Sequence, residues 1–279
     1  MSRHTTFRTG GPADYYLSPE IGQAGEVLSL CRREGVPVEI IGNGSNLLVG
    51  DKGIRGAVVE IGQNAAEVSA EGTTLYAQAG ASLAKAAQEA ARSSLAGLEF
   101  ASGIPGTVGG AVVMNAGAYG GEMKHVLQWA KVLLPEGKVQ KFSVQELKMS
   151  YRHSLIQELS GVVLEASFAL KQEDEDLIRA QMEVYRNQRS QKQPLEYPSA
   201  GSTFKRPEGY FAGKLIMDAG LRGCRLGGAQ VSEKHCGFVI NRDHATAADI
   251  RGLMELVQQK VQECFGVWLE PEVKMVGEF

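Results

Sequence analysis

The hydrophobic and polar positions of residues 1–60 predict short strands around a single helix. Apolar residues at helical spacing run from 21 to 34, and Gly35 followed by Pro37 is typical of a helix end. Short apolar runs that predict strands lie on both sides of this helix, at residues 13–17, 38–41, 47–49 and 57–61. The pattern therefore predicts a β-α-β-β unit in this part of the chain.

The middle of the chain mixes both kinds of element. Short or alternating apolar runs predict further strands at residues 74–79, 126–134, 138–142 and 162–170. An alanine-rich helix is predicted at 82–93, and a polar helix at 174–192. The polar helix begins with Asp174, Glu175 and Asp176, whose negative charges suit the positive end of the helix dipole.

The strongest helix signal follows in the last third, at residues 247–265. Thr246 can cap this helix with Asp249 three residues on, and Gly266 can end it. One apolar stripe runs along it, through Ile250, Leu253, Met254, Val257 and Val261. Residues 267–276 then predict a final strand.

These elements predict an α+β protein in three parts. The first part covers residues 1–60, and the second covers 61–193, with the strand at 266–279 returning to it. The third part covers 194–265. A chain of 279 residues is long enough for two or three such parts, each with its own core.

Charge and composition exclude several classes of protein. The net charge is -3, so no positive field draws the chain to nucleic acid or to a membrane surface. Residues 1–11 lack the apolar segment of a signal peptide, and no apolar run approaches the roughly 20 residues that span a bilayer. We therefore expect a cytoplasmic protein. The four cysteines form no CxxC pair and the five histidines show no paired spacing, so we expect no metal.

Glycine is the residue that points to chemistry, because its 34 copies gather in loops. The first loop, 42–46, joins two predicted strands, lacks the Gly-Lys-Ser/Thr of a Walker loop and opens no helix. Glycine, asparagine and serine can still turn several backbone N–H groups inward and form an anion nest for a pyrophosphate. A plain turn between two strands is an equal alternative.

The second loop, 103–120, is built almost entirely from small residues. Such a segment offers little side-chain area to bury by itself. A large flat ligand lying against the backbone would supply the missing surface. The alternative is a buried, tightly turned segment with no ligand.

Five motifs in order then identify a family. They are His4 to Phe7, the two glycine loops, Tyr151-Arg152-His153-Ser154, Gly201-Ser202-Thr203-Phe204 followed by Lys205-Arg206-Pro207, and Leu269-Glu270-Pro271-Glu272-Val273. Over almost the whole chain, this order resembles the UDP-N-acetylenolpyruvoylglucosamine reductases, the MurB family of bacterial cell-wall synthesis. The length is similar to the shorter, type II branch.

The resemblance implies a PCMH-type FAD-binding fold in two subdomains, residues 1–60 and 61–193, plus a smaller substrate-binding domain at 194–265. FAD would be bound without a covalent link and NADPH would be the co-substrate. The enzyme would reduce UDP-N-acetylglucosamine enolpyruvate, a small molecule, to UDP-N-acetylmuramate for peptidoglycan precursors. We expect a monomer. The implied FAD contacts are Gly42, Asn43, Gly44, Ser45, Asn46, Gly103, Ile104, Pro105, Gly106, Thr107, Gly109, Gly110, Asn115, Ala116, Gly117, Ala118, Tyr119, Gly120, Arg152 and Val162.

The resemblance also implies roles for three catalytic residues. Arg152 suits a carboxylate on which charge builds up, because a guanidinium binds it with a planar fork. Glu272 would donate to the developing enolate in its protonated form, with Glu270 as a structural neighbour. Ser202 would be the proton donor to carbon.

Cations and amides near these motifs are candidates for the substrate's diphosphate and its other polar groups. They are Lys192, Lys205, Arg206, Gln230 and Asn241. Lys192 shares a polar helix with Arg186 and Arg189, which is typical of a solvated face. Two other functions stay open, a flavin oxidase of the same fold and a nucleotide-sugar-binding module without catalysis.

Overall fold

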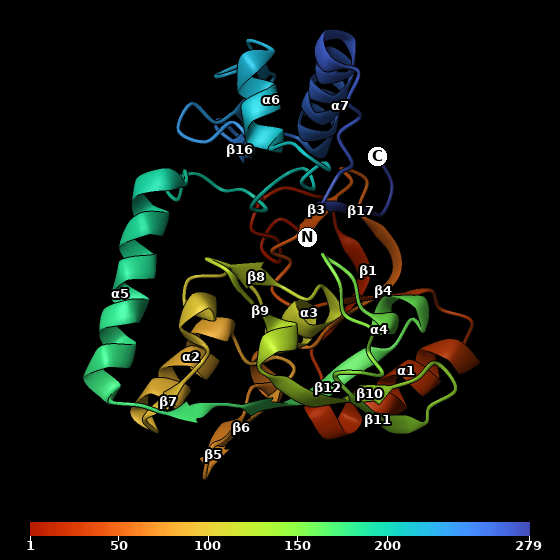
Figure 1. Ribbon diagram of the computed structural model, residues 1–279. Coiled ribbons are helices and arrows are strands. Elements are labelled where there is room, and N and C mark those ends of the chain that lie inside the picture. Colours follow the sequence, from red (N-terminus) through yellow and green to blue (C-terminus); the bar gives the residue numbers. More distant parts are fainter. The chain divides into compact units, whose positions relative to one another are not determined.

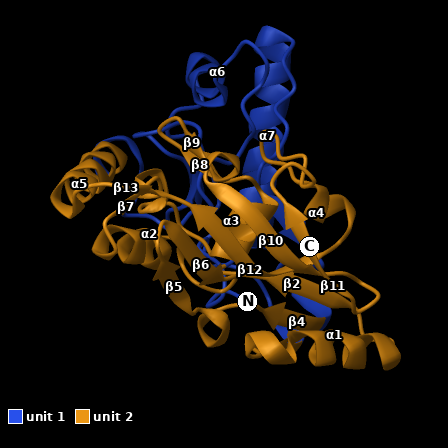
Figure 2. Ribbon diagram, turned by 60° about the horizontal axis from the view of Figure 1, so that its bottom comes forward, with its two compact units in different colours: residues 1–14, 44–56, 190–279 blue, residues 15–43, 57–189 orange.

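A computed structural model describes all 279 residues, which divide into two units (Figure 2). Unit 1 comprises residues 1–14, 44–56 and 190–279, and unit 2 comprises residues 15–43 and 57–189. None of the helices combines the length and the apolar character that crossing a bilayer requires.

Helices and runs of short strands follow one another along the chain (Figure 1), as expected of an α+β protein. The α-helices are α1 (Ala24–Arg33), α2 (Leu83–Arg92), α3 (Val108–Val113), α4 (Leu155–Glu158), α5 (Glu175–Lys192), α6 (Ala212–Asp218) and α7 (Ala247–Phe265). The strands are β1 (Ala13–Leu17), β2 (Val38–Ile41), β3 (Leu47–Val49), β4 (Ile54–Glu60), β5 (Val68–Glu71), β6 (Thr74–Gln78), β7 (Leu95–Ala96), β8 (Gly117–Ala118), β9 (Gly121–Glu122), β10 (Leu127–Leu133), β11 (Val139–Ser143), β12 (Val162–Ala169), β13 (Lys171–Gln172), β14 (Arg225–Leu226), β15 (Ala229–Val231), β16 (Val239–Asn241) and β17 (Lys274–Val276).

Unit 2 is built on an antiparallel five-stranded sheet of order β11-β10-β12-β6-β5. The strands alternate buried and exposed positions, as β6 shows with Leu75 and Ala77 buried between more exposed neighbours, so one face of the sheet meets the core. Helices α2 and α3 pack against the sheet. The buried stripe of α2 is alanine apart from Leu83, and small side chains let a helix approach closely. This close packing brings the start of α3 against the end of β6.

Unit 1 has its own core beneath α7. The predicted capping box is confirmed, because the Thr246 hydroxyl accepts from the Asp249 N–H at 3.0 Å. Gly266 ends the helix in the left-handed conformation, at φ 67°. The predicted stripe is buried as well, and each such side chain stabilises the fold by about 1.5–3 kcal/mol. The helix covers the small antiparallel sheet β14-β15-β16.

The last strand differs from its prediction. Residues 267–276 do not form one strand, since only β17 (Lys274–Val276) pairs in parallel with β3. Pro271 has no N–H to donate to a ladder and makes a single bridge with Phe204. The C-terminal segment belongs to unit 1, and its predicted return to residues 61–193 stays a prediction.

The second glycine loop also contains an unpredicted element. Residues Val108–Val113 form α3, a short helix capped by the Thr107 side chain. Two consecutive glycines, Gly109 and Gly110, weaken the helix signal by roughly 1 kcal/mol each. Packing against β12 and the other contacts of the core overrides that cost.

Asp51 provides a test of how α7 is anchored. Its two carboxylate oxygens accept from the N–H groups of Ala247 and Ala248, at 2.8 and 2.9 Å. Asp51→Ala leaves both donors without this partner, so the free energy of unfolding should fall by about 1 kcal/mol. Urea unfolding of the flavin-loaded protein measures the change. Asp243→Ala, at an exposed position, is the control, and equal midpoints for the two variants would contradict the anchoring role.

Candidate active site

The first glycine loop passes from unit 2 into unit 1 between Asn43 and Gly44. Gly42 lies against the second loop, because a Cβ atom there would sit 2.4 Å from the Thr107 hydroxyl oxygen. Gly44 has φ +57°, and a Cβ atom there would sit 2.0 Å from the His4 carbonyl oxygen. Neither position has room for a Cβ atom, so both require glycine, and the loop has no side chain at these two positions.

Residues 103–110 of the second loop combine a packed side with an uncovered one. The Gly109 N–H donates to the Ala79 carbonyl at 2.8 Å, which fixes α3 on the end of β6. Gly103, Pro105 and Gly110 are exposed. A Cβ atom at Gly110 would meet nothing closer than 3.6 Å. The scarcity of large side chains at these exposed positions fits a flat cofactor such as a flavin.

Asn115 fixes the rest of the second loop from within. Its buried side chain donates to Glu122 and to the Ser150 carbonyl, both at 2.9 Å, and accepts from the Lys124 N–H at 3.0 Å. It also takes φ 42°, which asparagine tolerates better than most residues. Hydrogen bonds from Lys124 and then Asn115 hold the pKa of Glu122 below its ordinary value. The Asn115 amide thus supports the loop, and a direct flavin contact stays a prediction.

Arg152 is held beside the end of α3. Ser154 of the same motif is fully buried, and its hydroxyl donates to the Val113 carbonyl at 2.8 Å. The Gln157 amide on α4 donates to the carbonyls of Val113 and Arg152, at 2.9 and 3.2 Å. Arg152 takes φ 56°, a conformation that usually needs support from its surroundings. These bonds place the Arg152 backbone close to the end of α3, and its guanidinium lies 4.9 Å from the centroid of the Tyr151 ring.

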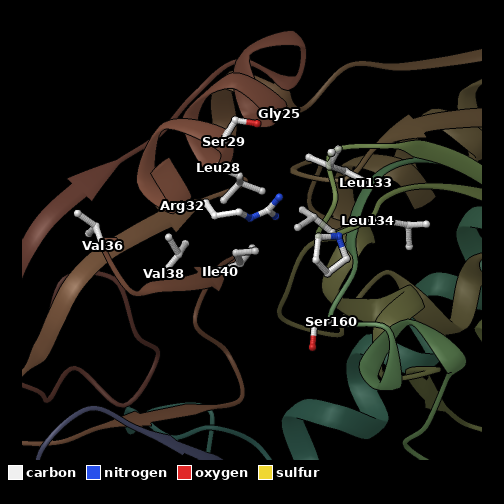
Figure 3. Close-up of a pocket in the computed structure, with 13 residues that line it drawn as sticks. Gly25, Leu28, Ser29, Arg32, Val36, Val38, Ile40, Leu133, Leu134 and Ser160 are labelled. Carbon is white, nitrogen blue, oxygen red and sulfur yellow. The ribbon is translucent and has the colours of Figure 1, made fainter. Parts of the chain in front are cut away.

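Val162 lies in different surroundings from the other predicted flavin contacts in unit 2. It begins β12 and lines an apolar cavity of about 280 Å³. Figure 3 shows this pocket with Leu28, Val38 and Ile40 directed toward it and Arg32 at its side. None of the glycine-loop residues lines it. The role of Val162 in flavin binding stays a prediction.

In unit 1, the segment that carries Ser202 is held on both sides. Ser199 bridges Ile240, and Phe204 bridges Pro271. Thr203 between them is fully buried, and its hydroxyl accepts from the Val239 N–H at 2.8 Å. Ser202 itself is exposed and follows Gly201, which takes φ +75°. The serine is therefore presented to solvent from a rigid segment.

Glu272 lies on the neighbouring segment. Its N–H donates to the Thr203 carbonyl, and its own carbonyl accepts from the Asn46 side chain, each at 2.9 Å. These bonds fix Glu272 next to the residue that follows Ser202. The structure thus brings the backbones of Ser202 and Glu272, two of the predicted catalytic residues, close together. Thr203 and Asn46 hold Glu272 in this place, a role that the motifs did not predict for them.

The neighbouring glutamate has a different part. The Glu270 carboxylate forms a salt bridge with the Lys205 ammonium, and the Glu270 carbonyl accepts from the Lys205 N–H at 2.8 Å. Glu270 thus has a structural partner in Lys205, and its part as a neighbour of the catalytic Glu272 stays a prediction. The salt bridge with Glu270 also occupies the Lys205 ammonium, which was predicted to bind substrate.

The remaining predicted substrate contacts are spread over unit 1. Arg206 lies over the Phe211 ring at 3.9 Å, and Lys192 is exposed at the end of α5. Gln230 is buried and donates to the Gly223 carbonyl at 3.2 Å. The buried Asn241 amide donates to the Phe7 carbonyl at 2.9 Å and accepts from the Ala245 N–H at 2.7 Å. Gln230 and Asn241 therefore have structural partners, and their contact with substrate stays a prediction.

Comparisons with known proteins agree with this geometry in both halves of the chain. A model of the FAD binding domain matches residues 18–143. A model of the C-terminal domain of UDP-N-acetylenolpyruvoylglucosamine reductase matches residues 193–276. The predicted FAD-binding fold with an additional substrate domain is confirmed.

Whole proteins match over nearly their full length. The UDP-N-acetylenolpyruvoylglucosamine reductase of Agathobacter rectalis is 57% identical over all of this chain and 93% of its own. That of Caldanaerobacter subterraneus is 52% identical over all of this chain and 92% of its own. The crystal structure of the Thermus caldophilus enzyme has a TM-score of 0.84 at 35% identity, covering 99% of this chain and 97% of that one. The chain therefore belongs to the UDP-N-acetylenolpyruvoylglucosamine reductase family.

Proposed function

We propose that this FAD-dependent reductase uses NADPH to reduce UDP-N-acetylglucosamine enolpyruvate to UDP-N-acetylmuramate, a step of peptidoglycan precursor synthesis. The observation that carries the proposal is the pairing of Ser202 and Glu272 in unit 1 through Thr203. An oxidase removes hydrogen from its substrate and has no use for a proton donor aimed at carbon, whereas an enol ether reductase needs one.

The glycine loops are the part of the chain suited to the flavin. Gly42 and Gly110 show backbone without side chains, and backbone N–H groups in such loops bind phosphate oxygens well. When bound and reduced, the flavin supplies the hydride for the terminal carbon of the enolpyruvyl group.

Arg152 has the chemistry to stabilise the charge that follows hydride addition. That charge spreads onto the carboxylate side of the enolpyruvyl group, and a guanidinium binds a carboxylate through two parallel hydrogen bonds. Because the motif backbone is fixed by Ser154 and Gln157, little reorganisation is needed when the charge develops.

Ser202 and Glu272 complete the reaction in this proposal. The exposed Ser202 hydroxyl gives its proton to the carbon next to the carboxylate, which is basic enough in an enolate to accept it. Glu272, protonated beside that carboxylate because like charges raise its pKa when substrate binds, donates a hydrogen bond to the enolate oxygen. Fixed positions for both groups raise the effective concentration of the acid.

Lys192 and Arg206 are the cations proposed for the substrate's diphosphate. Lys205 has the right charge, but its pairing with Glu270 must be exchanged for phosphate, so its contribution is the smallest of the three. A cytoplasmic location and a monomeric state stay predictions from the sequence.

The test of this function is NADPH oxidation by the purified protein, with and without the enolpyruvyl nucleotide. We expect rapid oxidation that depends on the nucleotide and forms UDP-N-acetylmuramate in equal amount. The same assay in air without the nucleotide is the control. Oxidation that depends on oxygen alone would contradict the reductase and favour an oxidase.

Separating the two half-reactions tests Ser202 directly. Ser202→Ala removes the proposed proton donor, so reoxidation of the flavin by substrate should slow by roughly 10²–10⁴. Reduction of the flavin by NADPH should stay near the wild-type rate, because no proton is delivered to carbon in that step. Stopped-flow absorbance of the flavin follows each half. Reoxidation within about tenfold of wild type would remove Ser202 from the role of general acid.

The contact between the two glycine loops gives a prediction for FAD affinity. Gly42→Ala places a methyl group 2.4 Å from the Thr107 hydroxyl oxygen, so one loop must shift and FAD should bind at least tenfold more weakly. Gly22→Ala is the matched control in the same unit, because nothing lies within 4 Å of its Cβ position. Flavin fluorescence during reconstitution of the apoprotein measures both affinities. Equal affinities for the two variants would show that the loop contact does not matter for FAD.

A further inference from the structure

Residues 150–153, at the start of the arginine motif (residues 151–154), form a tight turn with Arg152 as one of its two central residues. The backbones of Ser150 and His153 close this turn, because each N–H donates to the carbonyl of the other residue, at 3.0 and 3.2 Å. Arg152 takes φ 56° in the turn, a left-handed conformation that favours glycine or asparagine over other residues. An arginine stays in this conformation only where its surroundings hold it.

A buried side chain of the second glycine loop holds the carbonyl that closes the turn. The Ser150 carbonyl accepts from the His153 N–H and also, at 2.9 Å, from the side-chain amide of Asn115. Asn115 is only 1% exposed, so water cannot take the place of Ser150, and a movement of the turn would leave the amide without this partner. The bond thus ties the turn of the arginine motif to the second glycine loop.

The Asn115 amide has no N–H group left for a flavin. Its second N–H donates to the Glu122 carboxylate at 2.9 Å, and its oxygen accepts from the Lys124 N–H at 3.0 Å. The Lys124 ammonium pairs with the same carboxylate at 2.9 Å. An asparagine amide has two donor hydrogens, and both are used within unit 2. Residues 122–124 therefore hold the amide in one orientation, with its other N–H directed at Ser150.

Two further side chains join the same two segments from the opposite direction. Ser154 and Gln157 both donate to the Val113 carbonyl at the end of α3, at 2.8 and 2.9 Å. Helices α3 and α4 lie side by side (Figure 1). The second glycine loop and the arginine motif therefore hold each other through side chains from both segments, and Asn115 is the one that bonds the closing carbonyl of the turn.

We propose that Asn115 is a positioning residue for Arg152. Its amide fixes the turn so that the guanidinium is in place for a carboxylate, and Asn115 itself touches neither the substrate nor the flavin. Such positioning matters because a bidentate pair requires two N–H groups and two oxygens to be aligned at once. The inference rests on the proposed function, in which Arg152 binds the carboxylate side of the enolpyruvyl group.

Two other roles of Asn115 predict different results. A flavin contact, which the family resemblance implies, would make Asn115 important for FAD affinity. A purely structural role would make it important for the stability of unit 2 and for every ligand alike. Positioning of Arg152 affects a narrower quantity, the preference of the enzyme for a nucleotide that carries the carboxylate.

This preference is measured on the full-length, FAD-loaded protein as the ratio of two dissociation constants. UDP-N-acetylmuramate carries the carboxylate, and UDP-N-acetylglucosamine lacks it. Asn115→Gly removes the amide and keeps the backbone, because glycine adopts the φ of 42° found at this position without strain. Asn64→Ala is the matched control, since it removes an exposed amide that donates to the Ser18 carbonyl at 2.7 Å elsewhere in unit 2.

A double-mutant cycle with Arg152→Ala decides between the three roles. Arg152→Ala should lower the preference for UDP-N-acetylmuramate by about tenfold or more, because a charge-assisted bidentate pair is lost. Asn115→Gly should lower it roughly three- to tenfold by itself and less than about twofold in the Arg152→Ala background, where no guanidinium is left to position. FAD affinity and the rate of flavin reduction by NADPH should stay within about threefold of the Asn64→Ala control.

Other results of the cycle overturn the inference. An effect of Asn115→Gly that is absent, or equal in both backgrounds, shows that Asn115 does not act through Arg152. A fall in FAD affinity with an unchanged preference shows the flavin contact instead. A preference that Arg152→Ala leaves unchanged contradicts the proposed role of Arg152 itself, and the inference with it, which separates the two failures.

A second variant keeps the test decisive if Asn115→Gly does not retain FAD. Asn115→Asp has nearly the same shape and keeps an acceptor for the Lys124 N–H, but an ionised carboxylate has no donor for Ser150. It should lower the preference in the same way as Asn115→Gly, and again only where Arg152 is present. If neither variant retains FAD, Asn115 serves the loop alone and the positioning role is rejected.

Discussion

The buried Thr203 makes the interactions that hold the segments of Ser202 and Glu272 together in unit 1. Its N–H donates to the Gly237 carbonyl, its hydroxyl accepts from Val239, and its carbonyl accepts from the N–H of Glu272. A residue with no solvent access cannot exchange these bonds for water, so breaking any of them leaves a buried polar group without a partner. The exposed Ser202 therefore has a fixed place next to Glu272, although neither side chain is itself buried.

A different constraint operates in unit 2, where the backbone of a glycine must come close to the atoms of a neighbouring residue. Gly42 against Thr107 and Gly109 against Ala79 leave no room for a Cβ atom. The alanine stripe of α2 serves the same purpose on the sheet side. The loops consequently carry few large side chains, which is what the proposed flavin contact requires. Glycine is costly in a helix such as α3, and the packing of the short helix on β12 offsets that cost.

Local patterns in the sequence were enough to predict elements whose boundaries depend on neighbouring residues. Four elements have the predicted bounds: the strands at 13–17, 38–41 and 47–49 and the helix at 247–265. Their apolar periodicity lies inside each element, and their caps and turn glycines lie directly beside it. The motifs likewise led to the family, which the comparisons confirm. Elements fixed by distant contacts were missed or misjudged. Helix α3 exists because of the core around it, and residues 267–270 stay outside a ladder because of Pro271.

The same distinction explains what sequence patterns cannot reveal about a charged helix. Arg186 and Arg189 lie three residues apart on a mostly polar helix, and only the spacing of Ile178, Met182 and Tyr185 indicates that Arg189 is the less exposed of the two. Its packing also involves Gly103, more than eighty residues earlier in the chain, because a Cβ atom there would lie 3.2 Å from the Arg189 Cδ atom. A charge becomes informative about function when tertiary packing withdraws water from it and supplies no partner. Gly103, the first residue of the second glycine loop, thus lies beside a cation for which unit 2 supplies no carboxylate. Tertiary packing, more than local composition, decides how far each of these two charges reaches solvent.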